Sequence, residues 1–338
     1  MKLTPGKRKG LEAVSDSRGV IAAAAMDQRG SLKSAIAKDK GIDKKAVTQA
    51  MMEEFKGAVT RVLTPHASAI LLDPEYGLSA AKQRSRNAGL LLAYENSGYD
   101  NTRPGRLPDL LDHYSVRRLV ADGADCIKIL LYYTPFDSAE INDAKHAWVE
   151  RIGAECTAAD VPFFLELVGY EEGVDEKGPA FAKKKPECVI RSMEEFSNPQ
   201  YAVDVLKVEV PVTMAFVKGT QACKGDSVYS RDEAKDHFRK AAAAAKKPFI
   251  YLSAGVSNET FTETLELAAE SGVNFSGVLC GRATWKDAIP VYGMYGVKAL
   301  EEWLGDQGVK NIKNVNSRLA AAKPWFSFYG ATSASALA

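Results

Sequence analysis

The sequence has few of the residues that would place the protein among metal-binding or disulfide-bonded classes. Its 338 residues include four histidines, all scattered singly, at none of the spacings typical of a metal pair. The five cysteines are odd in number, widely spaced and form no C-x-x-C motif. We therefore expect no disulfide framework, no zinc cluster and no bound metal. Reduced structural cysteines are typical of a cytoplasmic protein.

Excess charge and long apolar runs are also missing. The chain has 44 Lys and Arg against 43 Asp and Glu, for a formal net charge of +1. This balance gives no reason to expect nucleic acid or an anionic membrane as a partner. The basic N-terminus leads into "LEAVSDSRG" in place of an apolar signal core, and "VIAAAAM" is too short to span a bilayer. We expect a cytoplasmic protein.

Eight apolar, strand-like runs recur along the chain with helical stretches between most of them. The runs are 19–28, 68–77, 89–95, 125–133, 161–170, 203–212, 248–257 and 275–285. Amphipathic helices are predicted at 44–63, 138–160, 230–247 and 258–271, and only a brief helix fits between the second and third runs. Ser230 and Asn258 are predicted to be N-caps of the last two helices.

This alternation predicts parallel strands joined by right-handed crossovers, and eight such units predict a (β/α)8 TIM barrel. We expect one α/β domain over residues 1–338, with a core from about 18 to 310. Helical additions are expected at the two ends, with the last residues loosely held. An open doubly wound sheet is the alternative. It usually has a glycine-rich turn after the first strand, whereas the first run here leads into "DQRG".

Polar residues gather near the C-terminal ends of the predicted strands, where TIM barrels carry their active sites. A structural ion-pair network can explain any one of them. Several charges at one end of a barrel are costly to bury unless they serve a function. The set comprises Asp27, Gln28, Asp73, Glu75, Glu95, Lys128, Glu166, Lys207, Glu209, Ser253 and Arg282.

Lys207 stands in the apolar run "VDVLKVEVPV", where a lysine needs a partner or a use. A neutral lysine amine attacks a ketone and forms a Schiff base, which acts as an electron sink when a neighbouring carbon–carbon bond breaks. Burial and a nearby cation both favour the neutral amine. Lys128 is the candidate for that cation, and Glu166 is the best-placed residue for proton transfer, with Asp27 second.

The last two strand-like runs indicate a phosphate site. "YLSAGVS" and "LCGRATW" place Ser253, Gly255, Gly281 and Arg282 where barrels often bind phosphate. Glycine-rich turns aim backbone N–H groups at an anion, and an arginine adds a charged fork. An ordinary turn with a solvated arginine is the alternative. Combined with a buried lysine, these motifs predict a phosphorylated carbonyl substrate.

Ten segments carry a resemblance to a known family. In chain order they are "DQRGSLK", "SAILLDPEYGL", "GLLLAYENSGYD", "GRLPDLL", "KILLYY", "ERIGAEC", "PFFLE", "DVLKVEVPV", "YLSAGVS" and "GVLCGRATW". From about residue 10 to 315 the chain resembles the LacD family of tagatose 1,6-bisphosphate aldolases, which are class I aldolases. The resemblance implies a (β/α)8 barrel that cleaves a ketohexose bisphosphate into dihydroxyacetone phosphate and glyceraldehyde 3-phosphate, without metal or cofactor.

The resemblance also implies roles for single residues. Lys207 corresponds to the Schiff-base lysine, and Glu166 to the proton-transfer residue. Lys128 and Asp27 correspond to charged active-site partners. The substrate and phosphate contacts correspond to Gln28, Arg29, Ser253, Gly255, Gly281 and Arg282. A homo-oligomer is expected.

Three alternatives stay open. Segments 171–188 and 216–229 match the family less well, which leaves the substrate identity undecided, along with the role of these loops. The related sulfofructose 1-phosphate aldolases are similar around the lysine, and "DPEYG" and "GYDNTRPGRLPD" set this chain apart from them. A phosphosugar-sensing barrel without activity is disfavoured by the presence of Lys207 and Glu166. A metal-dependent aldolase is disfavoured by the scattered histidines.

Overall fold

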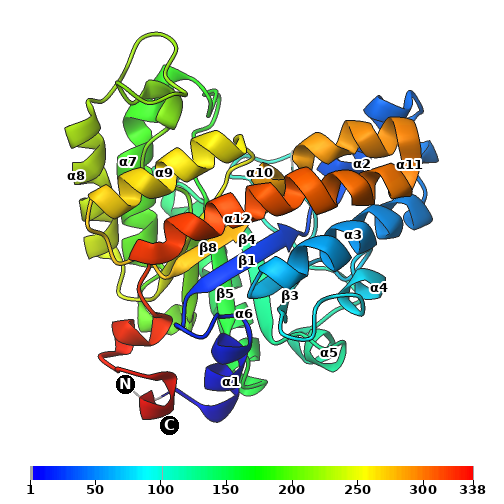
Figure 1. Cartoon of the computed structure of the whole chain (residues 1–338). Helices are drawn as coiled ribbons and strands as arrows, with labels where there is room; N and C mark the ends of the chain where they lie inside the picture. Colours follow the sequence, from blue (N-terminus) through cyan, green and yellow to red (C-terminus); the bar gives the residue numbers. More distant parts are fainter. Residues whose placement is uncertain (1–2, 101, 338) are drawn as a thin grey trace.

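The computed structural model describes residues 3–100 and 102–337, and its eight strands close into a parallel barrel in chain order (Figure 1). The first strand pairs with both the second and the eighth. The TIM-barrel prediction is therefore confirmed. The strands are β1 (Ile21–Met26), β2 (Ala69–Leu72), β3 (Gly89–Ala93), β4 (Cys126–Tyr132), β5 (Phe163–Val168), β6 (Val205–Val208), β7 (Phe249–Leu252) and β8 (Gly277–Cys280).

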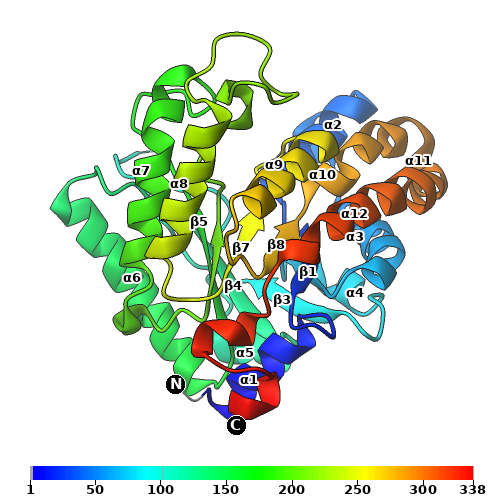
Figure 2. The same ribbon diagram turned by 60° about the vertical axis from the view of Figure 1, so that its left-hand side comes forward.

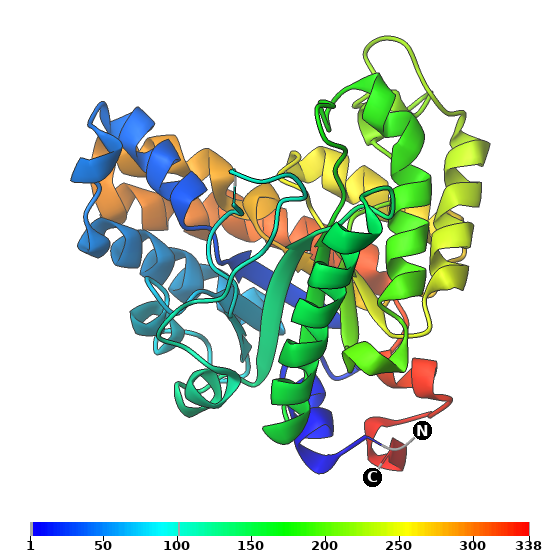
Figure 3. The same cartoon turned by 180° about the vertical axis from the view of Figure 1, so that it is seen from behind.

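Helices surround the strands, as the views from the side and from behind show (Figures 2 and 3). Those between β1 and β6 are α2 (Gly30–Lys40), α3 (Gln49–Leu63), α4 (Leu78–Ala81), α5 (Val116–Ala121), α6 (Ala139–Ala158) and α7 (Pro179–Glu195). Those after β6 are α8 (Arg231–Ala244), α9 (Asn258–Glu270), α10 (Arg282–Trp285), α11 (Ile289–Trp303) and α12 (Val309–Ser317). That the chain is a single domain with a core from about 18 to 310 stays a prediction.

Local capping chemistry explains where several helices begin. Ser230 caps α8 in a capping box with Glu233, which confirms that prediction. The predicted cap of α9 is wrong by one residue, because the Ser257 side chain accepts the Thr260 N–H and Asn258 is the first helical residue. The helix predicted from 44 begins at 49, where Thr48 accepts the Met51 N–H.

The helix α7 lies in a segment that the sequence analysis did not identify as helical. Pro186 stands inside this helix, and a proline is normally a signal that a helix ends. Its buried face includes Phe181, Val189 and Met193, so packing against the barrel outweighs the missing N–H of the proline.

The inside of the barrel is filled by alternate residues of the strands, and the residues between them face the helices. The inner set comprises Ile21, Ala23, Ala25, Ala69, Leu71, Leu91, Ala93, Cys126, Phe164, Val205, Ile250 and Leu279. All are apolar, and they fill the barrel as a packed core. This core reaches only as far as the last inward-facing positions before the strand ends.

The opposite, N-terminal end of the barrel is covered by the two ends of the chain, which lie together below the strands in Figure 1. Leu11 and Val14 of α1 (Pro5–Ala13) and its following turn join the inner core. Gly10 permits this close approach, because a Cβ there would lie 2.4 Å from the Asp125 carbonyl oxygen. Leu337 also joins this cluster and is 4% exposed, so the expectation that the last residues are loose is wrong for it.

Candidate active site

Charged residues occupy the inner positions that follow the apolar core on five strands, on the side of the strands' C-terminal ends. Each stands two residues after an apolar member of the inner core and therefore points the same way. Thus Lys128 follows Cys126, and Glu166 follows Phe164. In the same way Lys207, Asp27 and Glu95 follow Val205, Ala25 and Ala93. We call Asp27, Glu95, Lys128, Glu166 and Lys207 the lysine cluster.

Lys128 lies at the centre of the lysine cluster and is fully buried. Its Nζ is 2.8 Å from Asp27 Oδ2, 2.8 Å from Glu95 Oε1 and 2.7 Å from Glu166 Oε2. Three strands thus direct a carboxylate at one ammonium group. Such compensation is what a buried charge requires.

Glu166 also reaches the second lysine, because its Oε1 lies 2.8 Å from Lys207 Nζ. Glu166 and Lys207 are paired in register on β5 and β6, so the strand pairing itself brings them together. One carboxylate therefore bridges two lysines. Glu166 stands between the two ammonium groups, and the expectation that Lys128 supplies a positive charge near Lys207 stays a prediction.

The electrostatics of the lysine cluster favour the charged forms of Asp27, Glu166 and Lys128. Burial raises the pKa of the Glu166 carboxyl, but Lys128 and Lys207 lower it more, and the net pKa lies below the ordinary value. Burial also raises the pKa of Asp27, but the charges of Lys128 and Lys207 outweigh burial and hold that pKa well below its usual range. Burial raises the pKa of Glu95 despite Lys128 and Arg29. Burial lowers the pKa of Lys128, but its three carboxylates raise it well above the ordinary value.

The two residues after Asp27 lie beside the lysine cluster but differ in how they are held. The guanidinium of Arg29 is 2.7 Å from Glu75 Oε2, donates to the Glu95 carbonyl oxygen at 2.6 Å and is 6% exposed. Arg29 is therefore already paired within the protein. The Gln28 side chain donates to Asp27 at 3.2 Å and leaves its Oε1 buried without a hydrogen-bond partner among the described residues. Gln28 is thus the freer of the two to contact a substrate.

The turns after β7 and β8 bring the predicted phosphate-site residues together. After Ser253 the backbone takes two successive positive φ angles, 48° at Ala254 and 74° at Gly255. The guanidinium of Arg282 lies against Gly255, where an added Cβ would be 2.7 Å from its Cζ. Arg282 itself is exposed and starts the short helix α10 directly after Gly281. The sequence prediction that these four residues share one site stays untested by a ligand, but their proximity fits it.

Two polar residues of the site were given no catalytic or binding role from the sequence. Glu95 was noted only as a strand-end carboxylate, yet it contacts Lys128 directly. Lys56 of α3 is fully buried, pairs with Asp73 and donates to the carbonyl oxygens of Met26 and Gln28 at 2.7 and 2.9 Å. Lys56 lies on the apolar face of an amphipathic helix, and this position could have indicated from the sequence that it is buried. Lys56 thereby fixes the backbone that presents Asp27.

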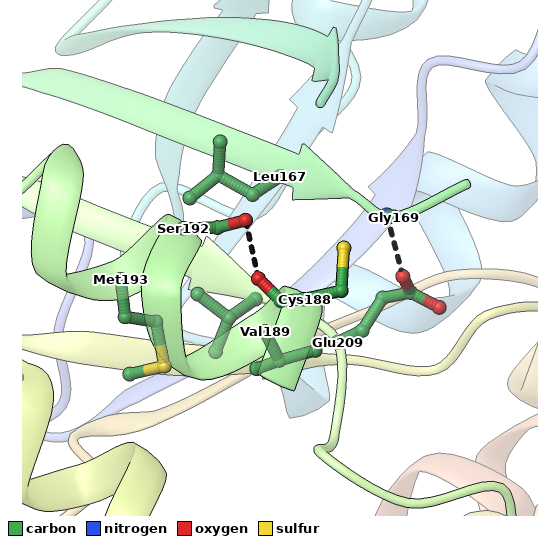
Figure 4. Close-up of a pocket in the computed structure, with 8 residues that line it drawn as sticks. Leu167, Gly169, Cys188, Val189, Ser192, Met193 and Glu209 are labelled. Atoms are coloured by element: carbon green, nitrogen blue, oxygen red, sulfur yellow. Dashed lines mark hydrogen bonds between the residues drawn. The ribbon is translucent and has the colours of Figure 1, made fainter. Parts of the chain in front are cut away.

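A small cavity lies outside the ring of strands, between β5, β6 and α7 (Figure 4). Its lining includes Leu167, Val189 and Glu209. Glu209 accepts the Gly169 N–H at 2.8 Å and pairs with Lys185 of α7 at 2.9 Å. The predicted strand-end residue Glu209 is therefore engaged with α7 and the β5 turn, and the cavity is separate from the lysine cluster.

Across the described ranges 3–100 and 102–337, no three histidine, cysteine, aspartate or glutamate side chains are arranged to hold a metal ion. The five cysteines are free thiols. In the part of the chain that the structure covers, no helix combines the length and hydropathy needed to cross a membrane.

The sequence profile of the DeoC/LacD family aldolases matches residues 21–287, which spans all eight strands. The chain belongs to the DeoC/LacD aldolase family. Among its relatives is the tagatose 1,6-diphosphate aldolase of Listeria monocytogenes serotype 4a, 50% identical over 98% of this chain and 96% of that protein. Tagatose 1,6-diphosphate aldolase 2 of Enterococcus faecalis is 51% identical over 96% of this chain and 97% of that protein.

The tagatose 1,6-diphosphate aldolase of Lactococcus lactis is 49% identical over 96% of this chain and 99% of that protein. Among solved structures, a Corynebacterium glutamicum protein matches with a TM-score of 0.56 at 14% identity, covering 90% of this chain and 88% of that protein. This last likeness concerns the fold alone. Membership of an aldolase family makes the lysine cluster the candidate active site of a carbon–carbon lyase.

Proposed function

We propose that this DeoC/LacD aldolase is a class I, Schiff-base enzyme that cleaves tagatose 1,6-bisphosphate, and also fructose 1,6-bisphosphate. The products are dihydroxyacetone phosphate and glyceraldehyde 3-phosphate. One observation carries the proposal. The carboxylate of Glu166 lies 2.8 Å from Lys207 Nζ and 2.7 Å from Lys128 Nζ inside the barrel. A lysine in contact with a proton acceptor is the arrangement that Schiff-base chemistry needs.

In the first stage, Lys207 gives up a proton to Glu166 and its neutral amine attacks the C2 carbonyl carbon. The carbinolamine that forms loses its hydroxyl group as water, with the proton supplied by Glu166. The product is an iminium ion on Lys207. Lys128 stays positively charged throughout, because its three carboxylate neighbours raise its pKa well above the ordinary value.

In the second stage, Glu166 accepts the proton of the C4 hydroxyl and the C3–C4 bond breaks. The bonding electrons move into the iminium and leave an enamine, and the C4–C6 half departs as the aldehyde. The enamine then takes a proton at C3, and water hydrolyses the resulting iminium to release dihydroxyacetone phosphate. Asp27 is held as a carboxylate by Lys128, so we assign it to orienting Lys128 and the substrate hydroxyls.

The turns after β7 and β8 support a phosphate site for the C1 end of the substrate. Ser253, Gly255, Gly281 and Arg282 would contact that phosphate, since the exposed Arg282 guanidinium and the backbone of Gly255 lie side by side. Gln28 has a buried, unpartnered Oε1 and is proposed as a further substrate contact. For Arg29 the ion pairs with Glu75 and Glu95 favour a supporting role over direct contact.

The substrate assignment comes from the relatives, three of which are named tagatose 1,6-diphosphate aldolases at 49–51% identity. Their names favour tagatose bisphosphate over sulfofructose 1-phosphate, and an intact lysine cluster favours an enzyme over a sensor. We further propose metal-independent catalysis, because a protonated Lys128 and a Schiff base supply the positive charge needed. We propose that the enzyme acts in the cytoplasm, which its cysteine usage supports. We also propose that it forms a homo-oligomer and has no nucleic-acid or membrane partner.

The test is an assay of the purified enzyme against the four ketohexose 1,6-bisphosphate epimers, with and without EDTA. Tagatose and fructose bisphosphates differ at C4, and strong discrimination there needs buried polar groups that the wrong epimer leaves unpaired. Because the substrate is anchored by its phosphates, we expect kcat/KM values within about a hundredfold, or about 2.7 kcal/mol. A ratio above about 10⁴ would contradict this tolerance. Loss of activity in EDTA would contradict metal independence.

A further inference from the structure

The loop between β3 and α5 carries the segment "GYDNTRPGR", which the proposed chemistry does not use. This loop folds back on itself, since the Asn96 N–H donates to the Asp109 carbonyl at 2.9 Å and Leu111 N–H to Tyr94 at 3.1 Å. A β-bridge joins Leu110 to Glu95, the residue that contacts Lys128. The loop is therefore anchored at the lysine cluster and lies at the C-terminal end of the barrel.

Arg106 of this loop is held among three tyrosine rings. Its Cζ lies 4.4 Å from the ring centroid of Tyr170, 5.0 Å from that of Tyr99 and 5.5 Å from that of Tyr132. The guanidinium also pairs with Glu176. Arg106 has a φ of 46°, in the left-handed region that non-glycine residues seldom adopt. The loop, β4 and the β5–α7 connection therefore meet at this one side chain.

Of the three rings, Tyr132 points toward the candidate active site. It stands on the same inner face of β4 as Lys128, four residues further along. Its ring meets that of Tyr99 edge to face with the centroids 4.9 Å apart, and the side chain is half-buried. Burial and Tyr99 raise the pKa of the Tyr132 phenol, and the charges of Glu166 and Lys128 both reach it. Tyr132 is thus a neutral phenol at the mouth, above the lysine cluster.

The closed barrel fixes which part of a substrate would meet Tyr132. In a ring of eight strands in chain order, β4 stands opposite β8. A substrate with its C1 phosphate at the β7 and β8 turns and its C2 carbon at Lys207 on β6 must extend its other end toward the strands opposite. That end is the C4–C6 half, which leaves as the aldehyde.

We propose that Tyr132 is a specificity-determining residue that contacts the C4–C6 half of the substrate. Arg106 is the positioning residue that, with Tyr99, holds the Tyr132 ring in place. This inference rests on the proposed aldolase function. It assigns a role to the loop that carries Arg106 and explains why that loop is tied to both β4 and the β5–α7 connection.

Two measurements on each variant separate the halves of the substrate. The first is KM for cleavage of tagatose 1,6-bisphosphate, which needs both halves. The second is borohydride trapping at Lys207 with dihydroxyacetone phosphate, which occupies only the C1–C3 half. Tyr132→Ala removes the ring, whereas Tyr132→Phe removes only the hydroxyl and keeps the packing. The phenylalanine variant therefore tests the contact even if the alanine variant does not fold. Tyr133→Phe is the matched control, because the neighbouring Tyr133 faces outward and its hydroxyl bonds His146.

We expect Tyr132→Ala to raise KM at least about tenfold, the order of effect of removing an aromatic contact, while trapping with dihydroxyacetone phosphate stays at the wild-type level. Tyr132→Phe should raise KM less, and Tyr133→Phe should leave it unchanged. An unchanged KM in both Tyr132 variants, or equal losses of cleavage and trapping, overturns the proposal. A wild-type enzyme that is not trapped refutes the proposed function itself, before any variant is measured.

A double-mutant cycle tests the positioning role of Arg106. Arg106→Gln keeps a polar side chain but removes the cation that the three rings surround. If Arg106 acts through Tyr132, Arg106→Gln raises KM in the wild-type background and has no further effect in the Tyr132→Ala background, with trapping unchanged in both. Additive increases in KM would show that Arg106 acts independently and overturn its assignment as the residue that positions Tyr132.

Discussion

Replacing Glu166 by glutamine perturbs the lysine cluster while preserving its shape. The amide has nearly the volume of the carboxylate but carries no negative charge and accepts no proton at neutral pH. In the variant, Lys128 keeps two carboxylate partners, Asp27 and Glu95, and the charge of Lys207 still acts on Asp27. The buried charges therefore stay balanced, and we expect the protein to fold.

The expected loss in kcat for Glu166→Gln is about 10²–10⁴-fold, the usual contribution of general acid–base catalysis. The assay is cleavage of tagatose 1,6-bisphosphate under saturating substrate, with folding checked by thermal unfolding. Glu209→Gln is the matched control. Glu209 is also a buried glutamate next to the catalytic strand, but it holds Lys185 and the Gly169 backbone outside the cluster. Its variant should lose stability and keep kcat within about tenfold of the wild type, because Glu209 transfers no proton.

The same variant has a consequence for acid stability. The folded-state pKa of Glu166 is lowered from the ordinary value of 4.5, because Lys128 and Lys207 outweigh its burial. A carboxyl with a depressed pKa contributes stability above pH 4.5 and loses it as the pH falls through the folded-state value. The unfolding free energy of the wild type should therefore fall more steeply on acidification below pH 4.5 than that of Glu166→Gln.

Near-wild-type kcat in Glu166→Gln would refute the assignment of Glu166 as the proton-transfer residue and would move that role to Asp27.

Two further predictions concern phosphate binding by Arg282 and the stability that the buried Lys56–Asp73 ion pair contributes. Arg282→Ala should weaken binding of phosphorylated substrates by about 1.5–3 kcal/mol, as for hydrogen bonds to charged groups, and should leave a dephosphorylated analogue unaffected; equal effects on both would make Arg282 structural. Lys56→Met should lower the unfolding free energy by about 3–5 kcal/mol in denaturant titrations, because it leaves Asp73 buried and unpaired. The double variant Lys56→Met/Asp73→Leu should recover much of that loss, and no recovery would mean that the ion pair is not the cause.

The barrel was predictable because its signals are local. Each of the eight strands lies inside an apolar run read from the sequence, and the crossovers between parallel strands leave few alternative topologies. The helix α7 escaped prediction because Pro186 stands in its interior, and its formation depends on packing that the sequence does not display. The cap of α9 differed by one residue because Ser257 and Asn258 are both good capping residues and only the backbone decides between them.

The candidate site was predictable where charge stands out against an apolar background. Lys128, Glu166 and Lys207 interrupt apolar strands, and strand alternation aims them inward. Their partnership was less accessible, because which carboxylate meets which lysine depends on the stagger of the barrel. Lys56 was hidden within a helix whose polar residues are normally solvated. Tyr132 was hidden because a tyrosine in an apolar strand has no distinguishing charge.

Mapping the lysine that forms the Schiff base tests the proposed chemistry at its decisive bond. The enzyme is incubated with dihydroxyacetone phosphate, reduced with borohydride, and digested for mass spectrometry. We expect one stable adduct, on Lys207, because its amine lies 2.8 Å from the proton acceptor Glu166. An adduct on Lys128 or on another lysine, or no adduct at all, would contradict this expectation.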